Sequence, residues 1–286
     1  MANLDAAGTY QIGDRTVHRI GYGAMQLAGK GVFGPPRDRA EAVAVLRAAV
    51  DAGVDHIDTS DYYGPFVVND IIREALHPYP AHLTLVTKVG AVRDAKGGWL
   101  PAQTPAQLTS AVQDNLTRLG IEQIGAVNYR AMFAQEPAKG SIATQVQTLA
   151  RLRDDGLIGG VGVSNVLPEQ IAEAQAITPV VCVQNMYNLA HRGDDALVDS
   201  LAAQGIAYTP FFPLGGFSPL QSDVLSREAA RLEITPLQAA LAWLLRRSPN
   251  ILLIPGTSSR AHLAENLAVA DITLDEEAIT ALNGMA

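Results

Sequence analysis

The sequence predicts an α/β protein: a (β/α)8 TIM barrel with an N-terminal β-hairpin and an extra C-terminal helix, in a single domain over residues 1–286. Short β-type runs alternate with longer amphipathic stretches along the whole chain, a pattern typical of a parallel sheet covered by helices. The alternation gives eight strand–helix units, and eight units favour a closed barrel over an open sheet. No linker or low-complexity segment divides the pattern, so we expect one domain.

The first expected element is the hairpin, in which Tyr10–Ile12 and Thr16–His18 flank the turn dipeptide Gly13-Asp14. In a barrel, we expect this hairpin to close the lower end. Eight strands then follow, at Arg19–Ala24, His56–Ser60, Leu83–Lys88, Ile124–Tyr129, Gly160–Ser164, Val180–Gln184, Ala207–Phe211 and Ile251–Ile254.

Several of the expected helices carry recognisable start signals. Asp38 with Glu41 forms a capping-box pattern, and Thr104–Gln107 and Thr235–Gln238 each combine a cap, a proline at the first helical position and a glutamine. The expected helices cover about 38–52, 67–76, 104–119, 141–155, 168–177, 194–204, 235–247 and 260–269, with a last one from about 273 to 281.

The composition limits the class of protein. Of 286 residues, 48% are hydrophobic and 17% charged, which supplies a large buried core. The net charge of −8 makes nucleic acid and anionic membranes poor partners, and no apolar run approaches the ~20 residues that a membrane span needs. The single cysteine, Cys182, allows neither a disulfide framework nor a zinc site. The N-terminal residues lack the features of a signal peptide, so we expect a cytoplasmic enzyme without a metal; the oligomeric state stays open.

Polar and aromatic side chains collect where the expected strands end, which in a barrel is where chemistry takes place. They are Asp58, Tyr63, Lys88, Arg130, Ser164, Asn165, Gln184 and Phe211, with Gly256, Thr257 and Ser258 after the eighth strand.

Asp58, Tyr63 and Lys88 suggest one use of this end of the barrel. A tyrosine has an ordinary pKa of about 10, so a nearby ammonium would help it to act as an acid, and an aspartate would hold that ammonium in place. Tyr63 could then protonate a carbonyl oxygen while hydride arrives at the carbon. Each residue also has an ordinary use, as a helix cap, a surface ion pair or a turn residue, and spacing alone does not decide between them.

Several segments in register resemble the aldo-keto reductase family. They are Gly53–Gly64, Val86–Lys88, Gly162–Asn165, Gln184, Phe211 with Pro213–Gly216, and Ile254–Ser258 with Glu265 and Asn266. The resemblance implies catalytic roles for Asp58, Tyr63 and Lys88, and reduction of a small carbonyl compound with a nicotinamide cofactor. It implies that Ser164, Asn165 and Gln184 hold the nicotinamide carboxamide and that Phe211 stacks on the ring. It assigns Pro213 and Leu214 to the loop after the seventh strand, and Gly256, Thr257, Ser258, Glu265 and Asn266 to the adenosine end.

Three further segments resemble a bacterial branch of this family that is related to pyridoxal reductase: Gly21–Leu27, Gly31–Arg39 and Pro210–Phe217. The branch implies reduction of the aldehyde of pyridoxal to pyridoxine with NADPH.

The match departs from the family at two places. Arg130 stands where a histidine is usual; we expect it to orient the carbonyl oxygen or to pair with an anionic oxygen such as the pyridoxal phenolate, unless it is merely paired with a carboxylate. Gly256 and His262 stand where many members carry cations for the 2′-phosphate of NADP, and Arg260 is a nearby substitute. NADPH is therefore expected mainly by resemblance, and NADH is less favoured.

Two other functions stay open at this stage. A cofactor-binding regulatory barrel with weak or no catalysis would explain Arg130, and an unrelated barrel could use Lys88 as a Schiff-base nucleophile. The expected wall of the substrate pocket is aromatic: Phe33, Tyr62, Phe66, Trp99, Tyr129 and Phe217.

Overall fold

The computed structural model describes residues 2–132, 136–213, 215 and 222–285. Its centre is a parallel sheet with the spatial order β11-β10-β9-β8-β5-β4-β3. The α/β class and the parallel arrangement are thus confirmed. The strands are β3 (Tyr22–Gly23), β4 (His56–Asp58), β5 (Thr84–Val89), β8 (Ala126–Arg130), β9 (Val161–Ser164), β10 (Val180–Gln184) and β11 (Ala207–Tyr208).

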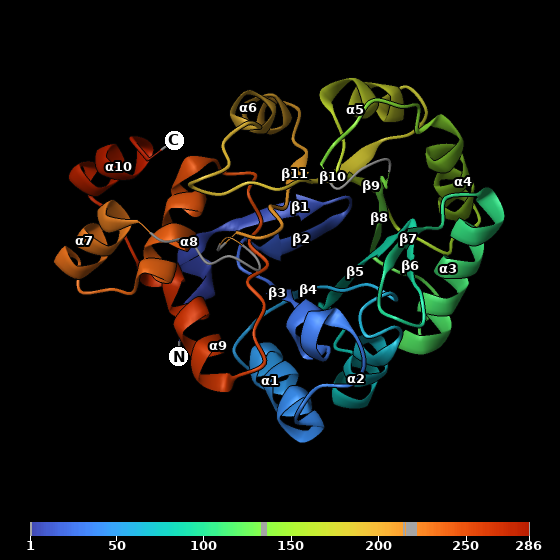
Figure 1. Ribbon diagram of the computed structural model, residues 1–286, viewed down its shortest axis with the longest axis horizontal. Coiled ribbons are helices and arrows are strands. Elements are labelled where there is room, and N and C mark those ends of the chain that lie inside the picture. The colour runs from blue at the N-terminus through green and yellow to red at the C-terminus, as the bar shows by residue number, and fades with distance from the viewer. Residues whose placement is uncertain (1, 133–135, 214, 216–221, 286) are drawn as a thin grey trace.

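Helices surround this sheet on its outer side, as the ring of coiled ribbons in Figure 1 shows. They are α1 (Arg39–Asp51), α2 (Val67–Leu76), α3 (Pro105–Leu119), α4 (Ala143–Asp154), α5 (Pro168–Gln175), α6 (Asp195–Ala203), α7 (Asp223–Arg231), α8 (Pro236–Arg247), α9 (Arg260–Leu267) and α10 (Glu276–Asn283). The capping boxes at Thr104 and Thr235 are confirmed, since each threonine accepts from the glutamine N–H three residues on and each glutamine side chain returns to the cap. The last helix is capped by Asp275 rather than opened by Thr273.

The eighth expected strand is the element that differs most from a regular strand. Its residues form single bridges, Ile251 with Tyr208 on β11 and Leu253 with Ile20 before β3. The Leu253 N–H donates to the Arg19 carbonyl at 2.8 Å, so this segment touches both edges of the sheet. The backbones approach so closely here that a Cβ on Gly23 would lie 2.4 Å from the Ile254 carbonyl oxygen.

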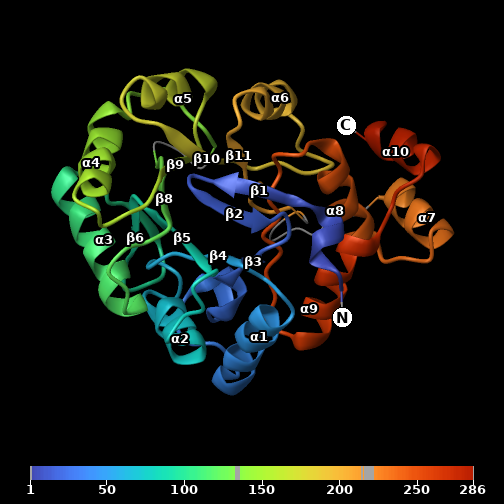
Figure 2. The ribbon, with the colours of Figure 1, turned by 180° about the vertical axis from the view of Figure 1, so that it is seen from behind.

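An antiparallel hairpin of β1 (Thr9–Ile12) and β2 (Arg15–His18) lies across one end of the ring, in front of it in Figure 2. Ile12 and Val17 from the hairpin pack against inward-facing strand residues that include Val86 and Cys182. Burial raises the pKa of the Cys182 thiol to about 12, which makes it a core residue rather than a nucleophile. A second hairpin, β6 (Ala91–Arg93) with β7 (Trp99–Pro101), follows β5 and was not expected.

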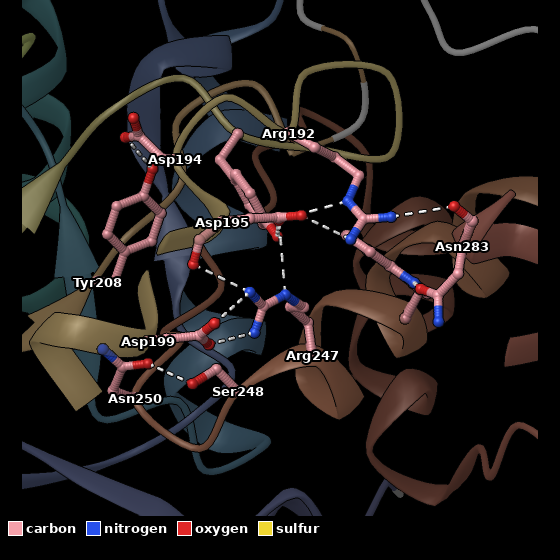
Figure 3. A network of polar contacts seen from close by, with 11 residues as sticks. Arg192, Asp194, Asp195, Asp199, Tyr208, Arg247, Ser248, Asn250 and Asn283 are labelled. Atoms are coloured by element: carbon pink, nitrogen blue, oxygen red, sulfur yellow. Dashed lines mark hydrogen bonds and ion pairs between the residues drawn. The ribbon is translucent and has the colours of Figure 1, made fainter. Parts of the chain in front are cut away.

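An ionic network ties the last third of the chain together (Figure 3). Arg247 of α8 forms ion pairs with Asp195 and Asp199 of α6, and Arg192 pairs with Asp195 and donates to the Asn283 carbonyl of α10. The network therefore fixes α6, which follows the loop after β10. None of the described helices combines the length and the apolar character that a membrane crossing requires.

Candidate active site

A buried ion pair between Lys88 and Asp58 forms the centre of the candidate site. The Lys88 Nζ donates to Asp58 Oδ1 and, at 3.1 Å, to the Thr59 carbonyl. The two side chains come from the ends of β5 and β4, which are hydrogen-bonded neighbours, and they are 5% and 4% exposed. A lysine in this state is engaged in an ion pair rather than free to attack a carbonyl, which argues against the Schiff-base alternative.

Gln184 reaches the same carboxylate from across the sheet. Its Nε2 donates to Asp58 Oδ2 at 2.9 Å, although β10 is four strands away from β4. The Gln184 Oε1 atom is buried and accepts no hydrogen bond from any described residue. Gln184 therefore holds Asp58, a contact that the sequence did not indicate, and its Oε1 atom can accept a hydrogen bond from a ligand.

Tyr63 lies beside this pair, with Lys88 Nζ 5.2 Å from the centroid of its ring. Burial raises the pKa of Tyr63 above its ordinary value, and the Asp58 carboxylate raises it further, while Arg130 lowers it. The pKa of Tyr63 in the free protein is therefore raised rather than lowered as expected, because burial and the Asp58 carboxylate act against the neighbouring cations.

Arg130 ends β8 with its guanidinium inside the site. Its Nη1 donates to Ser164 Oγ at 3.3 Å, and its Cζ lies 4.6 Å from the centroid of the Phe211 ring. Within the described ranges Arg130 forms no ion pair with a carboxylate, and Glu136 acts on it only through space. Burial lowers the pKa of this guanidinium. An arginine held in this way is suited to receive an anion.

The other expected cofactor residues fall into two groups. Ser164 and Asn165 end β9 and are almost fully buried, and the Phe211 N–H donates to the Asn185 carbonyl, next to Gln184. These residues therefore lie around Arg130 and Gln184. Pro213 follows as a buried residue, whereas Leu214 and Phe217 lie outside the described residues.

The second group follows segment 251–254, the expected eighth strand. Gly256 packs on the backbone of Gly23, Thr257 Oγ1 accepts from the Ser259 N–H, and Ser258, Glu265 and Asn266 lie on the same loop and on α9. Arg260 is exposed, but its guanidinium binds both oxygens of Glu41, and its N–H also donates to that carboxylate at 3.3 Å. A carboxylate therefore already lies at the amino end of α9, where a phosphate was expected.

The aromatic wall is only partly as expected. Tyr62 and Trp99 meet edge-on with centroids 5.4 Å apart, and Arg93 stacks between Trp99 (4.0 Å) and Phe33 (5.4 Å). Arg93 also donates to the carbonyls of Gly31, Val32 and Gly97, which ties the loop before α1 to the β6–β7 hairpin. Tyr62 also meets Tyr63 edge-on, with ring centroids 5.4 Å apart, so this aromatic group adjoins the candidate site.

Two predicted wall residues are elsewhere, and the prediction was wrong for them. Phe66 faces Arg118 of α3 at 4.9 Å, on the helix side of the sheet. Tyr129 is fully buried between Asn128 and Arg130 on β8. Alternation along a strand points it away from the face that carries Arg130.

Asp61 is a buried carboxyl beside the site that the sequence did not single out. Burial raises its pKa from 3.8 to about 7, although a hydrogen bond from Ser60 opposes the shift. Since the folded protein keeps this proton to a higher pH than the unfolded chain does, the stability that it contributes is lost as pH rises from about 4 to about 7.

We expect Asp61→Asn to stabilise the protein more at high pH than at low pH. The gain in unfolding free energy should be roughly 2 kcal/mol larger at about pH 8.5 than at about pH 5. Urea unfolding of both proteins at the two pH values measures this difference, with the exposed Asp271→Asn as control. A gain that does not change with pH would show that Asp61 is ionised in the folded protein throughout.

Three comparisons place the chain among known proteins. A model of the Aldo/keto reductase family matches residues 19–286. Pyridoxine 4-dehydrogenase of Escherichia coli (strain K12) is 58% identical over 282 residues, which cover 98% of this chain and 99% of that protein. An aldo/keto reductase of Klebsiella pneumoniae, solved in complex with NADP and acetate, superposes with a TM-score of 0.78 at 26% identity, over 96% of this chain and 94% of that one. A thermostable aldo-keto reductase solved with the inhibitor epalrestat gives a TM-score of 0.82 at 25% identity, over 97% and 99% of the two chains.

Proposed function

The chain belongs to the aldo/keto reductase family and acts on carbonyl and alcohol groups, and from this we propose that it reduces the aldehyde of pyridoxal to pyridoxine with NADPH. The observation that carries the proposal is Arg130, a partly buried guanidinium without a carboxylate partner among the described residues, whose charge acts on Tyr63. Pyridoxal carries a phenolate oxygen beside its aldehyde, so it presents both groups that such a site can receive. The 58% identity to pyridoxine 4-dehydrogenase supports the same substrate.

In the proposed reaction Tyr63 is the acid. Its raised pKa keeps the hydroxyl protonated at neutral pH, so it can give its proton to the carbonyl oxygen as that oxygen gains negative charge. Lys88 beneath the ring and Arg130 beside it then stabilise the phenolate that remains, until water returns the proton. Asp58 and Gln184 keep Lys88 in place through the two carboxylate oxygens.

The residues around Gln184 fit a nicotinamide. Its free Oε1 can accept from a carboxamide N–H, Ser164 offers a hydroxyl, and Asn165 and Phe211 lie at neighbouring strand ends. When bound, NADPH supplies the hydride that reduces the carbonyl carbon. We propose that Pro213 and Leu214 flank this part of the cofactor, and that Gly256, Thr257, Ser258, Glu265 and Asn266 hold its adenosine end.

The preference for NADPH over NADH depends on Arg260 in this proposal. Because Arg260 is paired with Glu41, a 2′-phosphate has to share the guanidinium with that carboxylate or displace it. We propose that it displaces Glu41 and takes its place at the amino end of α9, where backbone N–H groups favour an anion.

The scaffold that we propose for this chemistry is a complete (β/α)8 barrel in one domain. The bonds of segment 251–254 to both edges of the sheet support closure, and the family model extends over residues 19–286. A single, buried cysteine suits a reducing compartment such as the cytoplasm.

The direct test is the oxidation of NADPH, followed by absorbance, with pyridoxal and with pyridine-4-carboxaldehyde, which lacks the phenolic oxygen. We expect pyridoxal to react with a kcat/KM at least about 10-fold higher, because a hydrogen bond to a charged group contributes roughly 1.5–3 kcal/mol. Equal rates would show that the protein reduces aldehydes but does not prefer pyridoxal as its substrate. Intact NADPH binding by fluorescence without oxidation of any aldehyde would favour the regulatory alternative, and repeating the assay with NADH tests the cofactor preference.

Arg130→Met tests the anion contact itself. The variant keeps an unbranched side chain against Phe211 but removes the charge, so we expect about a 10- to 100-fold loss of kcat/KM for pyridoxal and a much smaller loss for pyridine-4-carboxaldehyde. Arg118→Met is the matched control, since Arg118 also stacks on a phenylalanine, Phe66, but outside the sheet. Equal losses of kcat/KM for the two aldehydes would show that Arg130 does not bind the phenolate oxygen of pyridoxal.

A further inference from the structure

Four polar side chains form a buried hydrogen-bonded chain behind the ion pair. The Thr59 hydroxyl donates to Asn69 Oδ1 at 2.8 Å, Asn69 Nδ2 donates to Asn115 Oδ1 at 2.9 Å, and the Thr87 hydroxyl donates to the same Asn115 oxygen at 2.7 Å. All four residues have no exposed surface. They come from the ends of β4 and β5 and from α2 and α3, so the chain connects two strands through two helices.

The directions of these bonds leave one arrangement of the two amides. Asn115 Nδ2 donates to the Ala111 carbonyl at 2.8 Å within its own helix, so its oxygen must point at Asn69 and Thr87. Both lone pairs of that oxygen are then used, and each threonine hydroxyl is a donor. A buried network in which each polar side-chain atom has a hydrogen-bond partner is rigid, because any displaced member would leave an unpaired polar group in the core.

Both ends of this series of hydrogen-bonded side chains connect to the Asp58–Lys88 ion pair. Thr59 follows Asp58, and its carbonyl accepts from Lys88 Nζ at 3.1 Å; Thr87 precedes Lys88. Since side chains alternate along a strand, Thr87 points to the helix side while Lys88 points into the barrel. The contacts therefore form a closed ring, from Lys88 through Thr59, Asn69, Asn115 and Thr87 back to Lys88.

A purely apolar contact between these helices and strands would hold the fold without fixing the ends of β4 and β5 in this way. We infer that the ring of Thr59, Asn69, Asn115 and Thr87 positions the Asp58–Lys88 pair under Tyr63, which makes these four side chains positioning residues for the proton transfer. The catalytic part of this inference rests on the proposed function.

Threonine gives a sharp test, because Thr→Val removes the hydroxyl and keeps the shape, whereas Thr→Ser keeps the hydroxyl. We expect Thr59→Val and Thr87→Val to lower kcat by about 10- to 100-fold with KM changed less than about threefold, and to shift the pH profile of kcat. Thr59→Ser and Thr87→Ser should recover kcat to within about threefold of the wild type. Thr148→Val is the control, since the Thr148 hydroxyl is buried but donates only to the Thr144 carbonyl of α4.

A second measurement does not depend on activity. The loss of Tm caused by Thr87→Val is measured in the wild type and in the Asp58→Asn/Lys88→Met background, and we expect it to shrink by about half there, because the ring no longer holds an ion pair. The inference is overturned if the valine variants keep kcat and the pH profile of the wild type, or if the loss of Tm is the same in both backgrounds. If the wild type reduces no aldehyde, the proposed function has failed and the Tm comparison alone decides the positioning role.

Discussion

Replacing Tyr63 by phenylalanine is expected to lower kcat for aldehyde reduction by about 10³-fold, within the range of general-acid catalysis. The variant keeps the ring beside which Lys88 lies, and the ring keeps its edge-on contact with Tyr62 at 5.4 Å. Only the hydroxyl is removed, so NADPH affinity should stay within about threefold of the wild type. Steady-state kinetics and a fluorescence titration with NADPH measure the two quantities separately.

Tyr62→Phe is the matched control for this experiment. Tyr62 is as buried as Tyr63, and burial raises its pKa as well, but its ring meets Trp99 edge-on, whereas the Lys88 Nζ lies over the ring of Tyr63. We expect Tyr62→Phe to lower kcat by less than about 10-fold. Near-normal turnover of Tyr63→Phe, or an equal loss in both variants, would remove Tyr63 from the role of the acid.

The second large effect is expected for Lys88→Met, in both activity and stability. The change leaves the Asp58 carboxylate buried with Gln184 as its remaining partner, and an uncompensated buried charge costs about 3–5 kcal/mol of unfolding free energy. Turnover should fall by at least about 10²-fold, since Tyr63 loses the cation that stabilises its phenolate. Urea unfolding and kcat measure the two effects.

Adding Asp58→Asn separates these two losses. The double variant carries no buried charge at this position, so we expect it to recover most of the lost stability and none of the lost turnover. Recovery of turnover in the double variant would contradict a catalytic role for Lys88. A Lys88→Met variant as stable as the wild type would show that Asp58 is not ionised in the folded protein.

The placement of Asp58 and Lys88 could be predicted from the sequence, because both end strands that are neighbours in a barrel. The sequence could not indicate that Gln184 donates to Asp58, since the two residues lie 126 positions apart and meet only across the interior of the folded sheet. The pairing of Arg260 with Glu41, 219 positions away, is hidden for the same reason.

The position of Tyr129 could have been predicted correctly from the sequence. Alternation along β8 already pointed Asn128 and Arg130 to one face, so Tyr129 between them belonged to the other face and not to the pocket wall. The pKa of Tyr63 was misjudged because the sequence shows which charges are near but not how deeply the group is buried, and here burial is the larger effect.

The Arg93 contacts have a consequence for how the substrate range of this protein can be altered. The residues proposed for proton transfer lie on β4, on β5 and on the segment between β4 and α2, whereas Phe33 lies on the loop before α1 and Trp99 on the β6–β7 hairpin. Arg93 joins this loop to the hairpin by bonds to three backbone carbonyls. Backbone carbonyls are present whatever the side chains are, so residues of these two segments can be substituted without losing the hydrogen bonds to Arg93. The aromatic side chains at Phe33 and Trp99 can therefore be varied one at a time to alter the substrate range, while the residues proposed for proton transfer stay in place.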